Sequence, residues 1–194
     1  MAAEHHPHTE PLSTEQYRAS RPNICGPDSG PEEPFPIVMY GLVQPGFGRG
    51  SKELGCPTAN LPDDAIELMA SKCQHGIYYG YARVHQPPHG KPGDLEETEI
   101  EVYPMVMSLG NNPYYNNEKM TAEVHVIHEF EHDFYGHEIS VLVLGYIRPE
   151  LDYTSRDALK EDIATDIRVT LNSVARPTYN KYREDAHWTR AQIR

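Results

Sequence analysis

The sequence predicts a mainly β domain in which a small antiparallel barrel carries one long C-terminal helix against its side. Between about residues 37 and 147, short segments rich in β-branched and aromatic residues alternate with turn signals, as in consecutive strands. After Pro149 the apolar residues recur about every four positions, which is typical of an amphipathic helix. A run of strands followed by one helix favours a barrel that packs the helix on its outside.

The expected elements begin with a strand at residues 37–43 and a short extended stretch at residues 57–60. A short helix is expected over residues 63–72, with Asp63 as its N-cap. Residues 76–84 follow as a strand rich in tyrosine.

The second half of the barrel begins after residues 85–98, whose prolines, glycines and charges predict a loop. The strand at residues 100–109 should therefore return antiparallel to the tyrosine-rich strand. Residues 120–130 and 137–147 are expected to form another antiparallel pair, joined by a turn around residues 133–136.

The last expected element is a helix, for which either Thr154 or Ser155 can serve as the N-cap. The negative charge of Asp157 lies in the first turn, where the positive end of the helix dipole stabilises it. One apolar stripe runs along this helix, and charged residues occupy the opposite face. We interpret the stripe as core packing rather than as part of a cofactor site: Leu159, Ile163, Ile167 and Leu171.

Composition divides the chain into a disordered tail at residues 1–34, which is rich in Pro, His, Glu and Ser, and one domain at residues 35–194. A net charge of −12 argues against a nucleic-acid binder. No apolar run approaches the roughly 20 residues that a membrane span needs, and the N-terminus lacks the apolar segment of a signal peptide. The three cysteines form no CxxC pair, which favours free thiols. We therefore expect a cytoplasmic monomer without a membrane span.

The stretch of residues 46–62, GFGRGSKELGCPTANLP, predicts a nucleotide-phosphate site. Glycines let backbone N–H groups approach a phosphate, and cations supply charge; the candidates are Gly46, Gly48, Gly50, Arg49 and Lys52. Thr58 and Asn60 are two residues apart, so in an extended chain their side chains share one face. Their oxygens suit a hard cation such as Mg²⁺. The stretch matches neither the P-loop nor the dinucleotide fingerprint, and a surface loop that binds nothing is the alternative.

A second motif points to a different chemistry. His128 to His132 reads HEFEH, which matches the HExxH signature of zinc proteases. That signature needs a helix, on which residues four apart share a face. The β-branched residues before it and the Tyr135-Gly136 turn signal after it favour extended chain, in which the two histidines stand about 13 Å apart at roughly 3.3 Å per residue. We therefore interpret this match as accidental.

Several separated stretches resemble the riboflavin kinase family, in the order in which that family carries them. The glycine-rich loop runs into Pro57-Thr58-Ala59-Asn60, and further similar stretches lie at residues 76–80, 112–115, 123–128, 133–136 and 145–150. The resemblance covers roughly residues 37–185. It implies a six-stranded Greek-key barrel with a C-terminal helix, and a kinase that transfers phosphate from ATP to riboflavin to give FMN and ADP.

The same resemblance implies roles for particular residues. Alternation along the strand places Glu123, His125 and Ile127 on one face, and Glu123 matches the family's catalytic base. The glycine-rich loop and Thr58 would bind the ATP phosphates. Thr58 and Asn60 would hold Mg²⁺, with Zn²⁺ or Mn²⁺ as alternatives.

Less specific matches complete the expected site. His128, Phe134 and Tyr135 are candidates for the adenine end of ATP, with ordinary barrel packing as the alternative. For riboflavin the candidates are Arg148, Glu150 and Trp188; Arg148 would either contact the flavin ring or pair with Glu150.

Two other functional classes stay open from the sequence. The chain could be a flavin- or nucleotide-binding module without catalysis, or a scaffold that binds partners through its acidic surface. The presence of Glu123, Thr58 and Asn60 argues against both. Residues 1–34 are too few for the adenylyltransferase domain that accompanies some members of this family, so FMN rather than FAD is the expected product.

Overall fold

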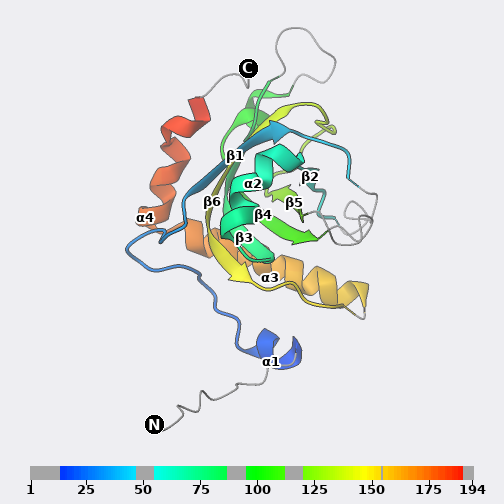
Figure 1. Ribbon diagram of the computed structural model, residues 1–194, viewed down its shortest axis with the longest axis vertical. Coiled ribbons are helices and arrows are strands. Elements are labelled where there is room, and N and C mark those ends of the chain that lie inside the picture. The colour runs from blue at the N-terminus through cyan, green and yellow to red at the C-terminus, as the bar shows by residue number, and fades with distance from the viewer. Residues whose placement is uncertain (1–13, 47–54, 87–94, 112–119, 154, 190–194) are drawn as a thin grey trace, which may run out of the picture.

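The computed structural model describes residues 14–46, 55–86, 95–111, 120–153 and 155–189 (Figure 1). In chain order its helices and strands are α1 (Thr14–Ala19), β1 (Ile37–Leu42), β2 (Ala59–Asn60), α2 (Asp63–Lys72), β3 (Gly76–Val84), β4 (Tyr103–Asn111), β5 (Met120–Val126), β6 (Glu138–Arg148), α3 (Arg156–Val174) and α4 (Pro177–Asn180). Short 3₁₀ turns lie at Glu97–Ile100, Lys181–Glu184 and Ala186–Thr189.

The six strands form one curled antiparallel sheet in the order β1-β6-β3-β4-β5-β2. Strands β3, β4 and β5 are neighbours in sequence, and β6 returns to lie beside β3, which is the order of a Greek key. The two edges of the sheet approach each other where Gln44, just beyond β1, bridges Asn60 in β2. The sheet is thus a half-barrel with α3 against its side, as Figure 1 shows, and the predicted fold class is confirmed.

One strand pairing differs from the sequence-based expectation. The segment 120–130 was expected to pair with 137–147, but β5 pairs with β4 and β2, whereas β6 pairs with β1 and β3. This prediction was wrong for a physical reason. Strand β6 is buried on both faces over most of its length, so it needs a neighbour on each side and cover on each face. Strand β5 alternates between buried and partly exposed residues.

The sheet separates two hydrophobic clusters, which explains why β3 and β6 are apolar on both faces. The inner cluster lies inside the curl under α2, with Ile66 and Met69 of that helix against Tyr78 and other strand residues. The outer cluster lies under α3 and α4 and includes Tyr79 and Tyr81. Tyr78 therefore points to the opposite side of the sheet from Tyr79 and Tyr81, as the period of a strand requires.

The two main helices begin differently from one another. Helix α2 spans the predicted residues, but Pro62 occupies its N-cap position without a side-chain hydrogen bond, so the prediction that Asp63 caps it was wrong. Asp63 lies instead in the first turn, where its charge suits the helix dipole. Helix α3 is capped by Ser155, whose Oγ accepts a hydrogen bond from the backbone N–H of Ala158 at 3.2 Å. This resolves the choice between Thr154 and Ser155.

The apolar stripe of α3 does not form the core face of that helix. Leu171 is 43% exposed, and Leu159 and Ile163 are only partly buried. The buried face carries Asp162 and Asp166 together with smaller side chains. The interpretation of the stripe as core packing was therefore wrong for Leu159, Ile163 and Leu171, whereas Ile167 packs against the outer cluster. The helix can bury the two aspartates because arginines from other segments neutralise them.

The segment before residue 35, expected to be a disordered tail, makes defined contacts in the part that the structure describes. Cys25 is 7% exposed; its backbone N–H donates to Ser173 Oγ at 2.9 Å, and its carbonyl accepts from Tyr79 Oη at 2.9 Å. Arg176 donates to the carbonyl of Gly26 at 2.8 Å. The sequence did not reveal these contacts because most of them use backbone groups, whose pairing leaves no pattern in the side chains.

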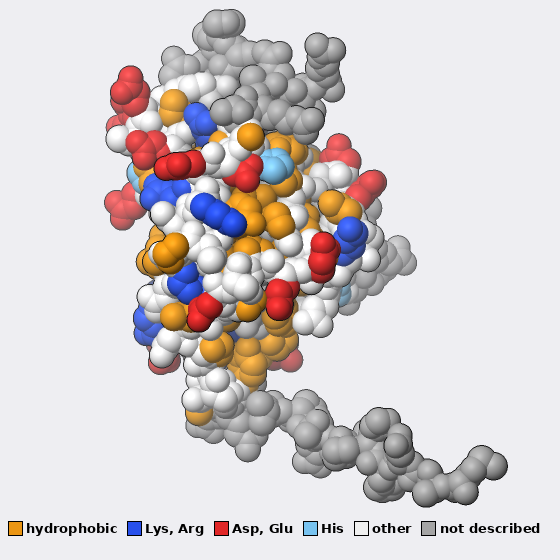
Figure 2. Space-filling model, turned by 90° about the vertical axis from the view of Figure 1, so that its left-hand side faces the viewer, with side chains coloured by type: hydrophobic (Ala, Val, Ile, Leu, Met, Phe, Trp, Pro, Cys, Tyr) orange, Lys and Arg blue, Asp and Glu red, His pale blue; other side chains and the backbone are white. Residues whose placement is uncertain are grey.

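On the face drawn in Figure 2, acidic and basic side chains are interspersed between hydrophobic ones, and the coloured residues form no broad basic surface. This agrees with the acidic composition of the chain. Among the described residues, none of the helices combines the length and the apolar character that crossing a membrane requires. All three cysteines are unpaired thiols.

Candidate functional site

One row of side chains crosses five strands of the sheet. In the strand registers, each member lies directly opposite the next: Arg148 in β6, Ile77 in β3, Ser108 in β4, Glu123 in β5 and Asn60 in β2. Directly opposed residues of paired strands project from the same face. The row therefore brings a guanidinium, a hydroxyl, a carboxylate and an amide to one face of the sheet, although they are up to 88 residues apart in sequence (148 − 60).

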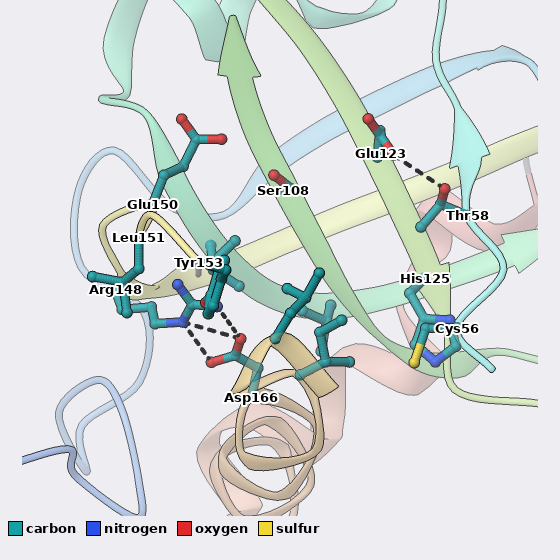
Figure 3. Close-up of a pocket in the computed structure, with 14 residues that line it drawn as sticks. Cys56, Thr58, Ser108, Glu123, His125, Arg148, Glu150, Leu151, Tyr153 and Asp166 are labelled. Carbon is teal, nitrogen blue, oxygen red and sulfur yellow. Dashed lines mark hydrogen bonds and ion pairs between the residues drawn. The ribbon is translucent and has the colours of Figure 1, made fainter. Parts of the chain in front are cut away.

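A cavity of about 250 Å³ lies over this row, between the outer face of the sheet and the beginning of α3. Its volume is near the lower end for small-molecule sites. The lining residues are Cys56, Thr58, Ile77, Val106, Ser108, Glu123, His125, Arg148, Glu150, Leu151, Tyr153, Leu159, Ile163 and Asp166. Figure 3 shows Thr58, Glu123 and His125 at one end, the Glu123 end, and Arg148, Tyr153 and Asp166 at the other, the Arg148 end.

The Glu123 end joins the carboxylate to the motif that follows the glycine-rich stretch. Thr58 Oγ1 donates a hydrogen bond to Glu123 Oε2 at 3.2 Å (Figure 3). His125 lies two residues along the same strand, and its Nδ1 is 2.9 Å from the carbonyl oxygen of Pro57. The predicted shared face of Glu123 and His125 is confirmed, since both line the cavity. These contacts fix the segment around Thr58 against β5.

Asn60 lies at the edge of this arrangement. Asn60 is 7% exposed and lies opposite Glu123 of β5. On its other side it forms an isolated antiparallel β-bridge with Gln44. A Cβ atom at Gly46 would lie 2.6 Å from Asn60 Nδ2, so a larger residue at this position would push the amide aside. Gly46 and Asn60 are therefore neighbours in the folded chain.

The Arg148 end contains a buried ion pair. The Arg148 side chain is 3% exposed, and its Nε and Nη2 donate to the carboxylate of Asp166 at 2.7–3.1 Å (Figure 3). Burial opposes the charge on Arg148, but the Asp166 carboxylate outweighs it and raises the pKa of the guanidinium above its ordinary value. Arg148 is therefore a fixed cation in the cavity wall, and its ion-pair partner is Asp166 on α3.

Glu150 also lines this end of the cavity, and its position depends on a glycine. A Cβ atom at Gly110 would overlap the Glu150 carboxylate, so the absence of a side chain on β4 leaves the space that Glu150 occupies. Nearby, burial raises the pKa of Tyr153 to about 12, which keeps its hydroxyl protonated near neutral pH.

The candidates for the adenine end lie apart from the cavity lining. His128 stacks on Tyr103 with the ring centroids 4.1 Å apart, and Phe134 packs against Phe130 at 4.5 Å. Tyr135 is 47% exposed in the turn before β6. Residues 128–132 form bends rather than a helix, so the two histidines of the HExxH match do not share a helical face. The match therefore lacks the helix that the signature needs, in agreement with its interpretation as accidental.

The remaining predicted site residues lie elsewhere. Trp188 is 4% exposed in the outer cluster, its Nε1 donates to the carbonyl of Tyr182 at 2.7 Å, and it does not line the cavity. Its flavin contact stays a prediction. Four predicted phosphate-binding residues, and the similar stretch at residues 112–115, lie outside the described residues: Gly48, Arg49, Gly50 and Lys52.

The structure adds to the site several residues that the sequence analysis did not select. Ser108 lies opposite Glu123 and lines the cavity, and Asp166 holds Arg148. The apolar wall from α3 consists of Leu159 and Ile163. No local signal marks Ser108, since only the register of β4 against β5 places it beside Glu123. For Leu159 and Ile163 the signal was the apolar stripe of the helix, whose first two members line the cavity.

Comparison with known proteins agrees with this geometry. The family model described as riboflavin kinase matches residues 33–174. The chain is 50% identical over 163 residues to a riboflavin kinase of Pyricularia oryzae, covering 82% of each chain, and 44% identical over 179 residues to that of Meyerozyma guilliermondii, covering 84% of this chain and 97% of the relative. The crystal structure of riboflavin kinase from Trypanosoma brucei superimposes with a TM-score of 0.63 at 26% identity, covering 82% of this chain and 92% of that one. The chain therefore belongs to the riboflavin kinase family.

Proposed function

We propose that this chain transfers the γ-phosphoryl group of ATP to the 5′-hydroxyl of riboflavin, giving FMN and ADP, with Glu123 as the general base. In this reaction the 5′-oxygen forms a bond to the γ-phosphorus while the bond from that phosphorus to the β,γ-bridging oxygen breaks. The hydroxyl proton passes to the Glu123 carboxylate, and ADP leaves with the electron pair of the broken bond. The observation that carries the proposal is the row of polar side chains along one cavity, with Glu123 beside Thr58 and Asn60 at one end of it.

Glu123 suits this role because of what surrounds it. Its carboxylate lines the cavity and accepts a hydrogen bond from Thr58, which holds it in one orientation. Ser108 stands opposite it on β4, so a polar hydroxyl flanks the carboxylate on that side too. A held carboxylate that faces a cavity can accept a proton from a bound hydroxyl group.

A kinase of this family needs a divalent metal, and we propose that Thr58 and Asn60 hold it. Their side chains offer a hydroxyl and an amide oxygen, the ligand types that a hard cation prefers, and Glu123 lies beside both in the sheet. We propose Mg²⁺ as the ion, with Zn²⁺ or Mn²⁺ as alternatives. When bound, such an ion neutralises charge on the phosphate oxygens. The close approach of Gly46 to Asn60 supports an ATP phosphate site at the same place.

The two ends of the cavity suggest how the substrates lie. The apolar wall of Leu159 and Ile163 and the fixed cation Arg148 suit a flat, polar-edged ring such as the flavin. The nucleotide would then extend from Glu123 past Asn60 and Gly46, with its adenine towards His128, Phe134 and Tyr135. The location in the cytoplasm and the monomeric state stay predictions.

The reaction is tested by incubating the purified protein with riboflavin, ATP and Mg²⁺ and separating the flavins by chromatography. We expect FMN and ADP in equal amounts and no FAD, and no product when a chelator removes the metal. Riboflavin and ATP binding without FMN would show a binding module that has lost catalysis. Failure to bind either compound would favour a scaffold and contradict the proposal.

A further inference from the structure

Two arginines of the N-terminal segment lie behind the Arg148 end of the cavity. Arg21 Nη1 donates to Asp162 Oδ1 at 2.8 Å, and its Nη2 donates to Asp166 Oδ1. Arg18 donates from Nε and Nη2 to the Asp162 carboxylate at 3.1–3.2 Å. This segment precedes residue 33, where the match to the family model begins.

Arg21 is the better buried of the two arginines in this contact. Its side chain is 5% exposed, and those of Asp162 and Asp166 are each 2% exposed, whereas Arg18 is 32% exposed. Arg21 uses its two terminal nitrogens on two different carboxylates, which a guanidinium can do because its donors are held in a rigid fork. Arg21 is therefore a bridge between two turns of α3 rather than a surface ion pair.

Arg21 is connected to the cavity wall through Asp166. Asp166 Oδ1 accepts from Arg21 and also from Arg148 Nε, so one carboxylate connects the N-terminal segment with the cavity cation. The guanidinium of Arg18 lies 5.9 Å from the centre of the Tyr153 ring, another residue of the cavity wall. The N-terminal segment thus supports the cavity from outside without lining it.

We propose that Arg21 is a positioning residue for riboflavin binding, acting through Asp166 on Arg148. Asp166 is held between Arg21 and Arg148, so it cannot turn without breaking one of two buried pairs. Arg148 in turn keeps one orientation in the cavity wall. Without Arg21, Asp166 is held by Arg148 alone among the partners described above, and the two side chains can move together away from the cavity. This inference rests on the proposed flavin position at the Arg148 end.

The test compares Arg21→Ala with Arg168→Ala, which removes an arginine from the exposed face of the same helix. For Arg21→Ala we expect the KM for riboflavin and the Kd from quenching of riboflavin fluorescence to rise roughly tenfold. The kcat and the KM for ATP should stay within about twofold, because Glu123 and Thr58 lie at the other end of the cavity. For Arg168→Ala all four values should stay within about twofold.

A purely structural role for Arg21 gives a different result. Loss of folded protein lowers the apparent kcat while the KM and Kd for riboflavin stay unchanged, and that outcome overturns the proposal. Should Arg21→Ala fail to fold, Arg21→Lys keeps the charge, but one compact ammonium replaces the two separate nitrogens with which Arg21 reaches Asp162 and Asp166, so the hold on Asp166 should weaken. An unchanged riboflavin Kd in folded Arg21→Lys also overturns the proposal.

Two further measurements separate this inference from the proposed reaction. If Arg21 acts through Asp166, the substitution should add little to the riboflavin Kd of Asp166→Asn, and full additivity of the two effects would contradict the pathway. The Kd is measured without ATP, so it reports on Arg21 even if the wild-type protein makes no FMN. If the wild-type protein makes no FMN but Arg21→Ala raises the riboflavin Kd tenfold, the proposed reaction is refuted and the role of Arg21 in riboflavin binding is retained.

Discussion

Replacing Glu123 by glutamine tests the proposed general base with little change of shape. The glutamine amide oxygen can still accept the hydrogen bond that Thr58 donates to Glu123 at 3.2 Å. The side chain keeps its place opposite Ser108 and Asn60 in the strand register. What the variant loses is the ability to take a proton. The substitution therefore separates proton transfer from positioning, which Glu123→Ala would not do.

The expected loss follows from the general-base role. General-base catalysis contributes about 10²–10⁴-fold, so the barrier should rise by about 2.7–5.4 kcal/mol, at 1.36 kcal/mol for each factor of ten. The kcat for FMN formation should fall by this factor, while the Kd for the metal–ATP complex changes little. A larger fall would indicate that Glu123 also positions the hydroxyl.

The assay is FMN formation under saturating substrates, followed by chromatography, together with a nucleotide-binding titration. Glu67→Gln, on the exposed side of α2 and outside the cavity, makes the same chemical change elsewhere and should keep the wild-type rate. A Glu123→Gln variant with near-wild-type kcat would refute the assignment of the base. The reaction itself would then need another proton acceptor in the cavity.

Three further changes test other parts of the structure. Thr58→Ala should raise the Mg²⁺ concentration needed for half-maximal turnover, because it removes one proposed oxygen ligand; an unchanged Mg²⁺ dependence would contradict that role. Gly110→Ala should raise the KM for riboflavin while sparing that for ATP, since the new Cβ displaces the Glu150 carboxylate, and equal KM values for riboflavin would exclude this effect. Burial lowers the pKa of His85 below its ordinary 6.5, so the unfolded chain binds the proton more readily and stability falls as the pH drops below about 6.5. The Tm of His85→Gln should fall less than that of the wild type between pH 7.5 and 5.5, and an identical fall in both would show that His85 contributes nothing.

The strands and the helices could be predicted because their periods are visible in the sequence. The apolar alternation of residues 120–126 and the four-residue spacing after Ser155 both reflect a local geometry that needs no knowledge of neighbours. The pairing of β6 could not be predicted in this way, because it depends on contacts with segments far away in the sequence. Strand β6 is buried on both faces and lies between β1 and β3. The expected neighbour in sequence, β5, was therefore the wrong partner.

The buried face of α3 shows a second limit of the sequence. Asp162 and Asp166 belong to the charged side of the helix by composition, yet both are among its most buried residues. They can be buried because Arg18, Arg21 and Arg148 approach them from segments more than 120 residues apart (148 − 18). The hydrophobic pattern of a sequence reflects how favourably each side chain alone leaves water. It gives no information about charged side chains that become buried because they find a partner in the folded chain.

The position of Arg148 depends on an irregularity between β3 and β6 that no motif predicts. Tyr78 lies opposite Tyr146, but Ile77 lies opposite Arg148, so the register shifts by one residue between these two pairs. Ile147 belongs to the outer cluster, and strict alternation would turn the next residue towards the inner one. The extra residue re-aims Arg148 to the outer face, where it meets Asp166 and shares the cavity with Glu123. The family motif at residues 145–150 therefore supplies the cation, and the bulge supplies its direction.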